Sequence, residues 1–209
     1  MTRALVAGGT GAVGRALLPL LASSDWEVHA WGRRRTDIAG VSDIAGDLGK
    51  VRFPAVDVAF CSLGTTHKEA GSEAAFRAVD HDLVLDFARA ARAAGARCFT
   101  FVSSAGASRR APSHYLKLKA EVEKELATLG FDRLVLVRPS LLLDDRPGRP
   151  WEQLAVEASR LLAPALRWFP ARGIEVKTLA LAMIRLAEQE APGVVIVENR
   201  ELHRLGASS

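Results

Sequence analysis

The residues best suited to chemistry are a tyrosine and a lysine in one predicted helix. Tyr115, the only tyrosine in the chain, lies four positions before Lys119, so both side chains share a helix face. A nearby ammonium lowers the pKa of a phenol, and such a phenol is a suitable general acid or base for a carbonyl or alcohol. Ser103 and Ser104 end the preceding predicted strand and can hydrogen-bond the same substrate oxygen. We predict Tyr115, Lys119 and Ser104 as catalytic, with the choice between Ser103 and Ser104 left open.

The pattern Tyr-x-x-x-Lys is common, and it also fits the exposed face of an amphipathic helix. Lys117, which lies between the two residues, shows how freely lysine is used in this stretch. The catalytic interpretation rests on the order of motifs along the chain. A glycine-rich turn comes first, the strand-end serines come next, and the tyrosine and lysine follow.

The glycine-rich turn lies between a predicted apolar strand and a predicted helix. Gly8, Gly11 and Gly14 form the pattern G-x-x-G-x-x-G, which in this context is typical of dinucleotide binding. Glycine permits the turn, the approach of the backbone to a pyrophosphate and close helix–strand packing. The helix N-terminus adds free N–H groups and a positive dipole end. The predicted phosphate-binding residues are Gly8, Thr10, Gly11, Ala12, Val13 and Gly14.

Arginines follow the second predicted strand, where a dinucleotide fold binds the adenosine ribose. An acidic residue at this place binds the ribose 2′-hydroxyl of NAD, whereas Arg33 and Arg34 are suited to a 2′-phosphate. We therefore predict a preference for NADP(H) over NAD(H); the alternative is a solvated basic loop. Asp47 follows the third predicted strand and is a candidate partner for the adenine amino group, although a Gly-Asp turn also explains it.

Strands alternate with helices along the chain, which predicts a Rossmann-type α/β fold. Its doubly wound parallel sheet would carry helices on both faces. We expect one domain over residues 1–209, with small substrate-side elements within about 141–192 and a loosely held C-terminal tail. The predicted strands are residues 3–7, 27–31, 41–45, 57–62, 97–102, 133–137 and 194–198, and the predicted helices are residues 12–21, 73–94, 113–129, 151–162 and 179–190.

The motifs together resemble the short-chain dehydrogenase/reductase superfamily over nearly the whole chain. The matching segments are GGTGAVG, the strand-end Ser-Ser, YLKLK and RPS. The segments FCSLGTTHKEAG, FVSSAGAS and LVLVRPSLLL resemble an atypical NAD(P)H-binding group within it. That group contains Tat-interacting oxidoreductase-like proteins and bacterial putative epimerases.

The resemblance implies roles for individual residues. Tyr115 would be the catalytic acid/base, and Lys119 would bind the nicotinamide ribose. Ser104 or Ser103 would orient the substrate oxygen. The remaining positions predicted to contact the cofactor are Leu63, Gly64, Thr65, Ser103, Pro139 and Ser140.

These features predict an NADP(H)-dependent oxidoreductase that transfers hydride between nicotinamide and a carbonyl or alcohol. The short region after residue 140 leaves little wall for a nucleotide-sugar pocket, so epimerisation is the weaker interpretation. The alternative is a redox-sensing or regulatory protein that binds NADPH and turns over little substrate.

Composition limits the other function classes. The net charge of +4 is dispersed and aromatic residues are only 6% of the chain, so we expect a small-molecule substrate and no nucleic acid. The five histidines lack metal-ligand spacing, so no metal site is predicted. The sequence shows no signal-peptide pattern or membrane-spanning run, and it has two cysteines, which favours a cytoplasmic location without membrane attachment. We expect a monomer or homodimer.

Overall fold

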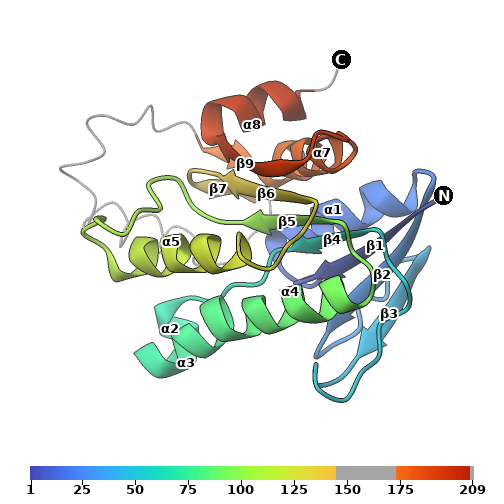
Figure 1. Ribbon diagram of the computed structural model, residues 1–209, viewed down its shortest axis with the longest axis horizontal. Coiled ribbons are helices and arrows are strands. Elements are labelled where there is room, and N and C mark those ends of the chain that lie inside the picture. The colour runs from blue at the N-terminus through green and yellow to red at the C-terminus, as the bar shows by residue number, and fades with distance from the viewer. Residues whose placement is uncertain (145–172, 208–209) are drawn as a thin grey trace.

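The computed structural model describes residues 1–144 and 173–207, which form a parallel sheet covered by helices on both faces (Figure 1). The crossover in strand order lies between β1 and β4, where a doubly wound sheet places its ligand crevice. This is the Rossmann-like arrangement that the sequence predicts. The seven strands of this sheet are, in spatial order, β3 (Val41–Ala45), β2 (Trp26–Gly32), β1 (Thr2–Ala7), β4 (Val58–Cys61), β5 (Cys98–Val102), β6 (Arg133–Arg138) and β9 (Gly193–Glu198).

Each face of the sheet has its own apolar core. On one face, α1 (Ala12–Ala22) and α7 (Val176–Ala187) pack against the strands (Figure 1). On the other face, α4 (Leu83–Ala93) and α5 (His114–Leu126) do so. The central strands β1 and β4 are buried on both faces, which explains their almost continuous apolar sequence. Because all the strands are parallel, their carboxyl ends meet at one edge, and the glycine turn and the strand-end serines lie there together.

The predicted helix over residues 73–94 is divided into three parts. They are α3 (Glu73–Arg77), the π-helical segment η1 (Ala78–Asp82) and α4. A short helix, α2 (His67–Ala70), precedes them. A π-helical turn rotates the side chains that follow it relative to a regular helix, and such turns are frequent at functional sites.

The C-terminal part has more structure than the sequence predicts. The tail expected to be loose forms α8 (Asn199–Gly206), which packs against α7, because Leu202 is completely buried there. Two short strands, β7 (Leu142–Leu143) and β8 (Ile174–Glu175), pair with each other outside the main sheet. The helix predicted over residues 151–162 lies outside the described residues.

Candidate functional site

The glycine turn has the geometry that its sequence predicts. The Gly11 N–H donates to the Gly8 carbonyl at 2.9 Å, and Gly8 has a φ of +85°. A Cβ added at Gly14 would lie 2.3 Å from the Gly8 carbonyl oxygen. At Gly8 a Cβ would lie 2.7 Å from Ser62 at the end of β4. Positions 8 and 14 therefore have no room for a side chain, which lets the turn pack closely on the start of α1 and the end of β4.

The N-terminus of α1 is open. Gly11 is its N-cap residue, no side chain caps the helix, and its first turn contains no acidic residue. The backbone N–H groups that begin a helix have no intrahelical partner, and they favour an anion together with the helix dipole. Thr10, Ala12 and Val13 continue the backbone on either side of Gly11. This arrangement fits the pyrophosphate of a dinucleotide cofactor.

The end of β2 carries positive charge. Arg33 and Arg34 are exposed, and among the described residues neither forms an ion pair. Arg35 differs, because its Nε lies 3.6 Å from Asp37 Oδ1. Two guanidinium groups are thus available where the predicted ribose site lies. Asp47 is exposed after β3, where it pairs with a lysine through a 2.9 Å contact between Lys50 Nζ and its carboxylate.

Tyr115 and Lys119 lie in the first two turns of α5, beside the carboxyl edge of the sheet. Tyr115 is half-buried and its ring packs against Phe76, with 6.1 Å between ring centroids. Lys119 is buried, and its ammonium lies 5.7 Å from the centre of the Tyr115 ring and 4.9 Å from that of Phe101. The ammonium is therefore held close to the phenol, as the helical spacing predicts.

Lys119 also has a partner that the sequence analysis missed. Its Nζ lies 3.0 Å from Oδ1 of Asp80, and both side chains are almost completely buried. The other Asp80 oxygen accepts the Thr65 N–H at 2.7 Å. One carboxylate thus connects η1, α5 and the loop of Leu63, Gly64 and Thr65 that follows β4.

Charge at this site favours the protonated lysine. Burial by itself lowers the pKa of Lys119, but the charges of Tyr115 and Asp80 and the hydrogen bond to Asp80 raise it by more. The pKa of Lys119 is therefore above its ordinary value, and the ammonium persists in the site. One signal for Asp80 is present in the sequence. It lies four residues after Phe76 and four before Val84, so an acid interrupts an apolar helical stripe.

The two candidate serines point to different partners. Ser103 is buried, and its Oγ donates to Glu123 Oε1 at 2.6 Å. Glu123 also accepts two hydrogen bonds from Arg138, at 2.9 and 2.6 Å. These contacts hold the Ser103 hydroxyl inside the fold. Ser104 is half-buried, and its hydroxyl has one long contact of 3.4 Å to the Ala105 carbonyl, so it is held less tightly than the Ser103 hydroxyl.

The loop after β6 lies beside the serine loop. The Ala105 N–H donates to the Pro139 carbonyl at 2.9 Å, which brings the two strand ends together. The Ser140 N–H donates to the Asn199 side chain at 3.0 Å, and this bond connects the loop with the start of α8. Pro139 and Ser140 therefore lie at the same sheet edge as the predicted catalytic residues.

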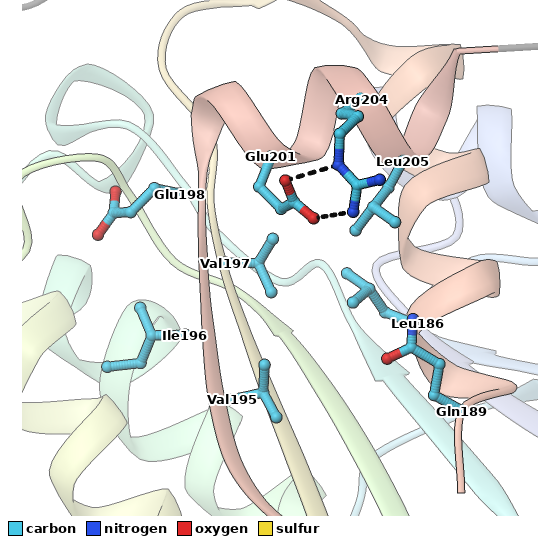
Figure 2. A pocket seen from close by; sticks show the side chains of 9 residues that line it. All are labelled: Leu186, Gln189, Val195, Ile196, Val197, Glu198, Glu201, Arg204 and Leu205. Carbon is cyan, nitrogen blue, oxygen red and sulfur yellow. Dashed lines mark hydrogen bonds and ion pairs between the residues drawn. The ribbon is translucent and has the colours of Figure 1, made fainter. Parts of the chain in front are cut away.

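A separate hollow lies at the far edge of the sheet, between β9, α7 and α8 (Figure 2). It measures about 490 Å³, and an ion pair between Glu201 and Arg204 lies at its wall. Figure 2 shows mainly aliphatic side chains around it, with Val195, Val197 and Leu186 among them. None of the predicted site residues lines this hollow, so we assign no chemistry to it.

Comparison with known proteins settles the family. The sequence profile described as NAD(P)H-binding matches residues 8–160, a stretch that contains the glycine turn and the predicted catalytic residues. The chain belongs to this NAD(P)H-binding family. Rat protein HTATIP2 is 33% identical over 98% of this chain and 89% of its own length. Protein FMP52, mitochondrial, of Eremothecium gossypii is 37% identical over 95% of each chain. The resemblance to the atypical short-chain dehydrogenase/reductase group is therefore confirmed.

Solved structures confirm the fold. The NADPH complex of the human epimerase family protein SDR39U1 has a TM-score of 0.66 at 20% identity, and 94% of this chain matches 74% of that one. MoeE5 in complex with UDP-glucuronic acid and NAD has a TM-score of 0.73 at 18% identity, with coverage of 94% and 75%. At these identities the likeness shows the fold alone, and NAD(P)H binding is supported by the family match.

One expectation is wrong. The prediction of a cytoplasmic location is contradicted by the relatives named FMP52, which carry the word mitochondrial in their names. Two buried free thiols are compatible with any reducing compartment, so they do not identify the cytoplasm. Among the described helices, none has the length and apolar character needed to cross a bilayer.

Proposed function

We propose that this protein is an NADP(H)-dependent oxidoreductase that interconverts a small carbonyl compound and its alcohol. The observation that carries the proposal is the position of Tyr115 beside the buried ammonium of Lys119, on the sheet edge that also carries the open glycine turn. The family match supports NAD(P)H binding, and the substrate class comes from the chemistry of the phenol.

The proposed cofactor contacts follow the sheet edge. The backbone from Gly8 to Gly14 binds the pyrophosphate, and Arg33 and Arg34 bind the 2′-phosphate of the adenosine ribose. Asp47 is proposed to contact the adenine. The loops that contain Leu63–Thr65 and Pro139–Ser140 flank the nicotinamide half.

A nicotinamide bound at this edge would supply or accept the hydride at the substrate carbon. In the reducing direction, Tyr115 donates its phenolic proton to the carbonyl oxygen, so the hydride and the proton together give the alcohol. Lys119 stabilises the phenolate that remains, and Ser104 donates a hydrogen bond to the substrate oxygen. Asp80 positions the Lys119 ammonium, because it holds that group at 3.0 Å and is itself held by the Thr65 N–H.

The test is a fluorescence titration of tag-free protein with NADPH and, separately, with NADH. We expect binding of NADPH in the micromolar range and much weaker binding of NADH. The double variant Arg33→Gln/Arg34→Gln is expected to weaken NADPH binding at least tenfold and to leave NADH binding unchanged. Arg35→Gln is the matched control, because Arg35 already pairs with Asp37 and its loss is expected to change neither affinity. Equal binding of both cofactors, or no effect of the double variant, would disprove the proposed preference.

A second candidate function is a regulatory protein that binds NADPH with little turnover. The buried carboxylate of Asp80 favours it, because it neutralises the charge that Lys119 offers to the phenol. A screen of aldehydes and quinones with NADPH distinguishes the two functions. Oxidation of NADPH that requires Tyr115 supports the enzyme, and tight NADPH binding with no turnover supports the regulatory protein.

A further inference from the structure

A second cluster of chemical groups lies where η1 packs on α5. His81 is buried in η1, and Glu121 and Glu125 lie one turn apart on α5. The Nε2 atom of His81 is 3.1 Å from Glu125 Oε1 and 3.6 Å from Glu121 Oε1. One ligand atom from each residue lies within 4.8 Å of the other two. An imidazole nitrogen and two carboxylates thus converge on one point.

The distances suit a small divalent cation. Zinc binds imidazole nitrogen and carboxylate oxygen at about 2.0–2.2 Å in a tetrahedral arrangement, which puts neighbouring ligand atoms about 3.3–3.6 Å apart. The two separations from His81 Nε2 are close to this range. Mixed imidazole and carboxylate ligands are typical of zinc and related first-row transition metals.

The other nitrogen of His81 is held as metal-binding histidines usually are. Its Nδ1 lies 2.7 Å from Oδ1 of Asp82. A carboxylate at this position accepts a hydrogen bond from the Nδ1–H group, which fixes the ring and leaves the Nε2 lone pair directed toward a metal. Asp82 lies outside the trio of potential ligands, so it is an independent feature of the site.

Solvent reaches the carboxylates. The side chains of Glu121 and Glu125 are 44% and 42% exposed, so a cation can reach their carboxylates without opening the fold. His81 is only 7% exposed and lies on the buried side of the cluster.

We propose that His81, Glu121 and Glu125 bind one divalent transition-metal cation of the zinc class, with Asp82 as the positioning carboxylate. In the metal-free protein the guanidinium of Arg77 neutralises part of the cluster. It donates to both oxygens of Glu121, at 2.8 and 3.1 Å, and lies 3.3 Å from His81 Nε2. This side chain is 41% exposed, so a metal that displaces it breaks a half-exposed ion pair, which contributes little to stability.

A metal bound to His81, Glu121 and Glu125 would connect two elements that also carry the proposed catalytic residues and their partner. His81 follows Asp80, the partner of Lys119, and both glutamates lie on the helix that carries Tyr115. A metal bound here ties η1 to α5 next to the proposed catalytic pair. Because it binds the folded state, it stabilises that state.

The experiment is calorimetric titration of tag-free, chelator-treated protein with zinc chloride. We expect one saturable equivalent in the wild type and its loss in His81→Ala and Glu125→Gln. Asp82→Asn is expected to weaken binding by about 10- to 100-fold. Arg77→Met removes the competing cation, so it is expected to tighten zinc binding several-fold, which a merely structural ion-pair cluster does not predict.

The control variant is His114→Ala, because His114 pairs with Glu73 outside the cluster and its loss is expected to leave zinc affinity unchanged. Circular dichroism checks that each variant is folded. If His81→Ala unfolds, Glu125→Gln still tests the proposal, because a half-exposed side chain can be replaced without unfolding the protein. The proposal is overturned if neither the wild type nor Arg77→Met binds zinc saturably. It is also overturned if binding persists in both His81→Ala and Glu125→Gln.

Discussion

The two halves of the sheet edge are built by different means. Around β1 and β2, the predicted cofactor half presents backbone groups and exposed charges. Gly8 and Gly14 have no room for a side chain, and Arg33 is exposed to solvent. Around β4, β5 and α5 the predicted catalytic half consists of buried charge, with Lys119 and Asp80 paired in the interior. The difference has a physical reason, because phosphate recognition needs space and N–H groups, whereas proton chemistry needs charges that water does not screen.

The largest expected effect is on turnover in the catalytic half. With a carbonyl substrate found in the screen, Tyr115→Phe is expected to lower kcat by about 10²- to 10⁴-fold, because the phenolic proton is lost. The affinity for NADPH is expected to stay within about threefold of the wild type, since the proposed phosphate contacts lie in the other half. Steady-state kinetics and fluorescence titration check the two values. A Tyr115→Phe protein that retains full kcat contradicts the assignment.

The next effect concerns the stability of the buried pair. Lys119→Met leaves the Asp80 carboxylate buried without its partner, and we expect a loss of about 3–5 kcal/mol in the free energy of unfolding. The double variant Lys119→Met/Asp80→Leu is expected to recover most of that loss, although not activity. Urea denaturation of the wild type and of the single and double variants gives both values. If the double variant is as unstable as Lys119→Met, the unpaired Asp80 carboxylate is not the cause of the lost stability.

Backbone crowding in the cofactor half gives a smaller loss of stability. Gly14→Ala places a Cβ 2.3 Å from the Gly8 carbonyl oxygen, so the turn must shift, and we expect a loss of about 2–3 kcal/mol with much weaker NADPH binding. Gly11→Ala is the matched control, because its Cβ would lie 3.2 Å from the same oxygen. Thermal unfolding and NADPH titration of both variants measure the loss of stability and of cofactor affinity at each position. Equal effects of the two substitutions would mean that the close contact of Gly14 with the Gly8 backbone is not what the turn requires.

An exposed ion pair at the opposite end of the strands provides the smallest effect. Two side-chain hydrogen bonds from Arg3 lower the pKa of Asp57 to about 2. A lowered carboxyl pKa stabilises the fold above the unfolded pKa of about 3.9, and this stabilisation is lost as the pH falls through the folded value. Because the pair is about 40% exposed, we expect Asp57→Asn to cost less than about 1 kcal/mol at pH 7.

Denaturation of the wild type and Asp57→Asn between pH 7 and pH 2 measures this difference. We expect the gap between the two proteins to close as the pH falls from about 4 to about 2. A gap that does not depend on pH would show that Asp57 acts through packing and not through its charge.

Much of the fold could be predicted because its signals are local. The alternation of apolar strands and amphipathic helices predicts the parallel sheet, and each predicted strand is present within a residue or so in the described chain. The π-helical turn could not be predicted, because residues 73–94 have continuous helical periodicity. The helix of the C-terminal tail was missed because its stability comes from packing Leu202 against α7.

The candidate site likewise contains features that the local sequence predicts and features that depend on contacts between distant residues. The glycine positions and the spacing of Tyr115 and Lys119 are properties of neighbouring residues, so the sequence predicts them, and their roles stay predictions until tested. The choice between Ser103 and Ser104 depends on the hydrogen bond from Ser103 to Glu123, twenty residues away along the chain. No local pattern contains that information.

Local sequence patterns specify the class of fold, the glycine turn before α1 and the helix on which the phenol and the ammonium share a face. These depend on backbone freedom and helical periodicity, which act over a few residues. The tertiary structure alone decided the partners of the buried charges. Asp80 meets Lys119, and His81 meets Glu121 and Glu125, because η1 packs on α5. Charges taken out of water require partners, and the packing of distant segments determines which partners are within reach.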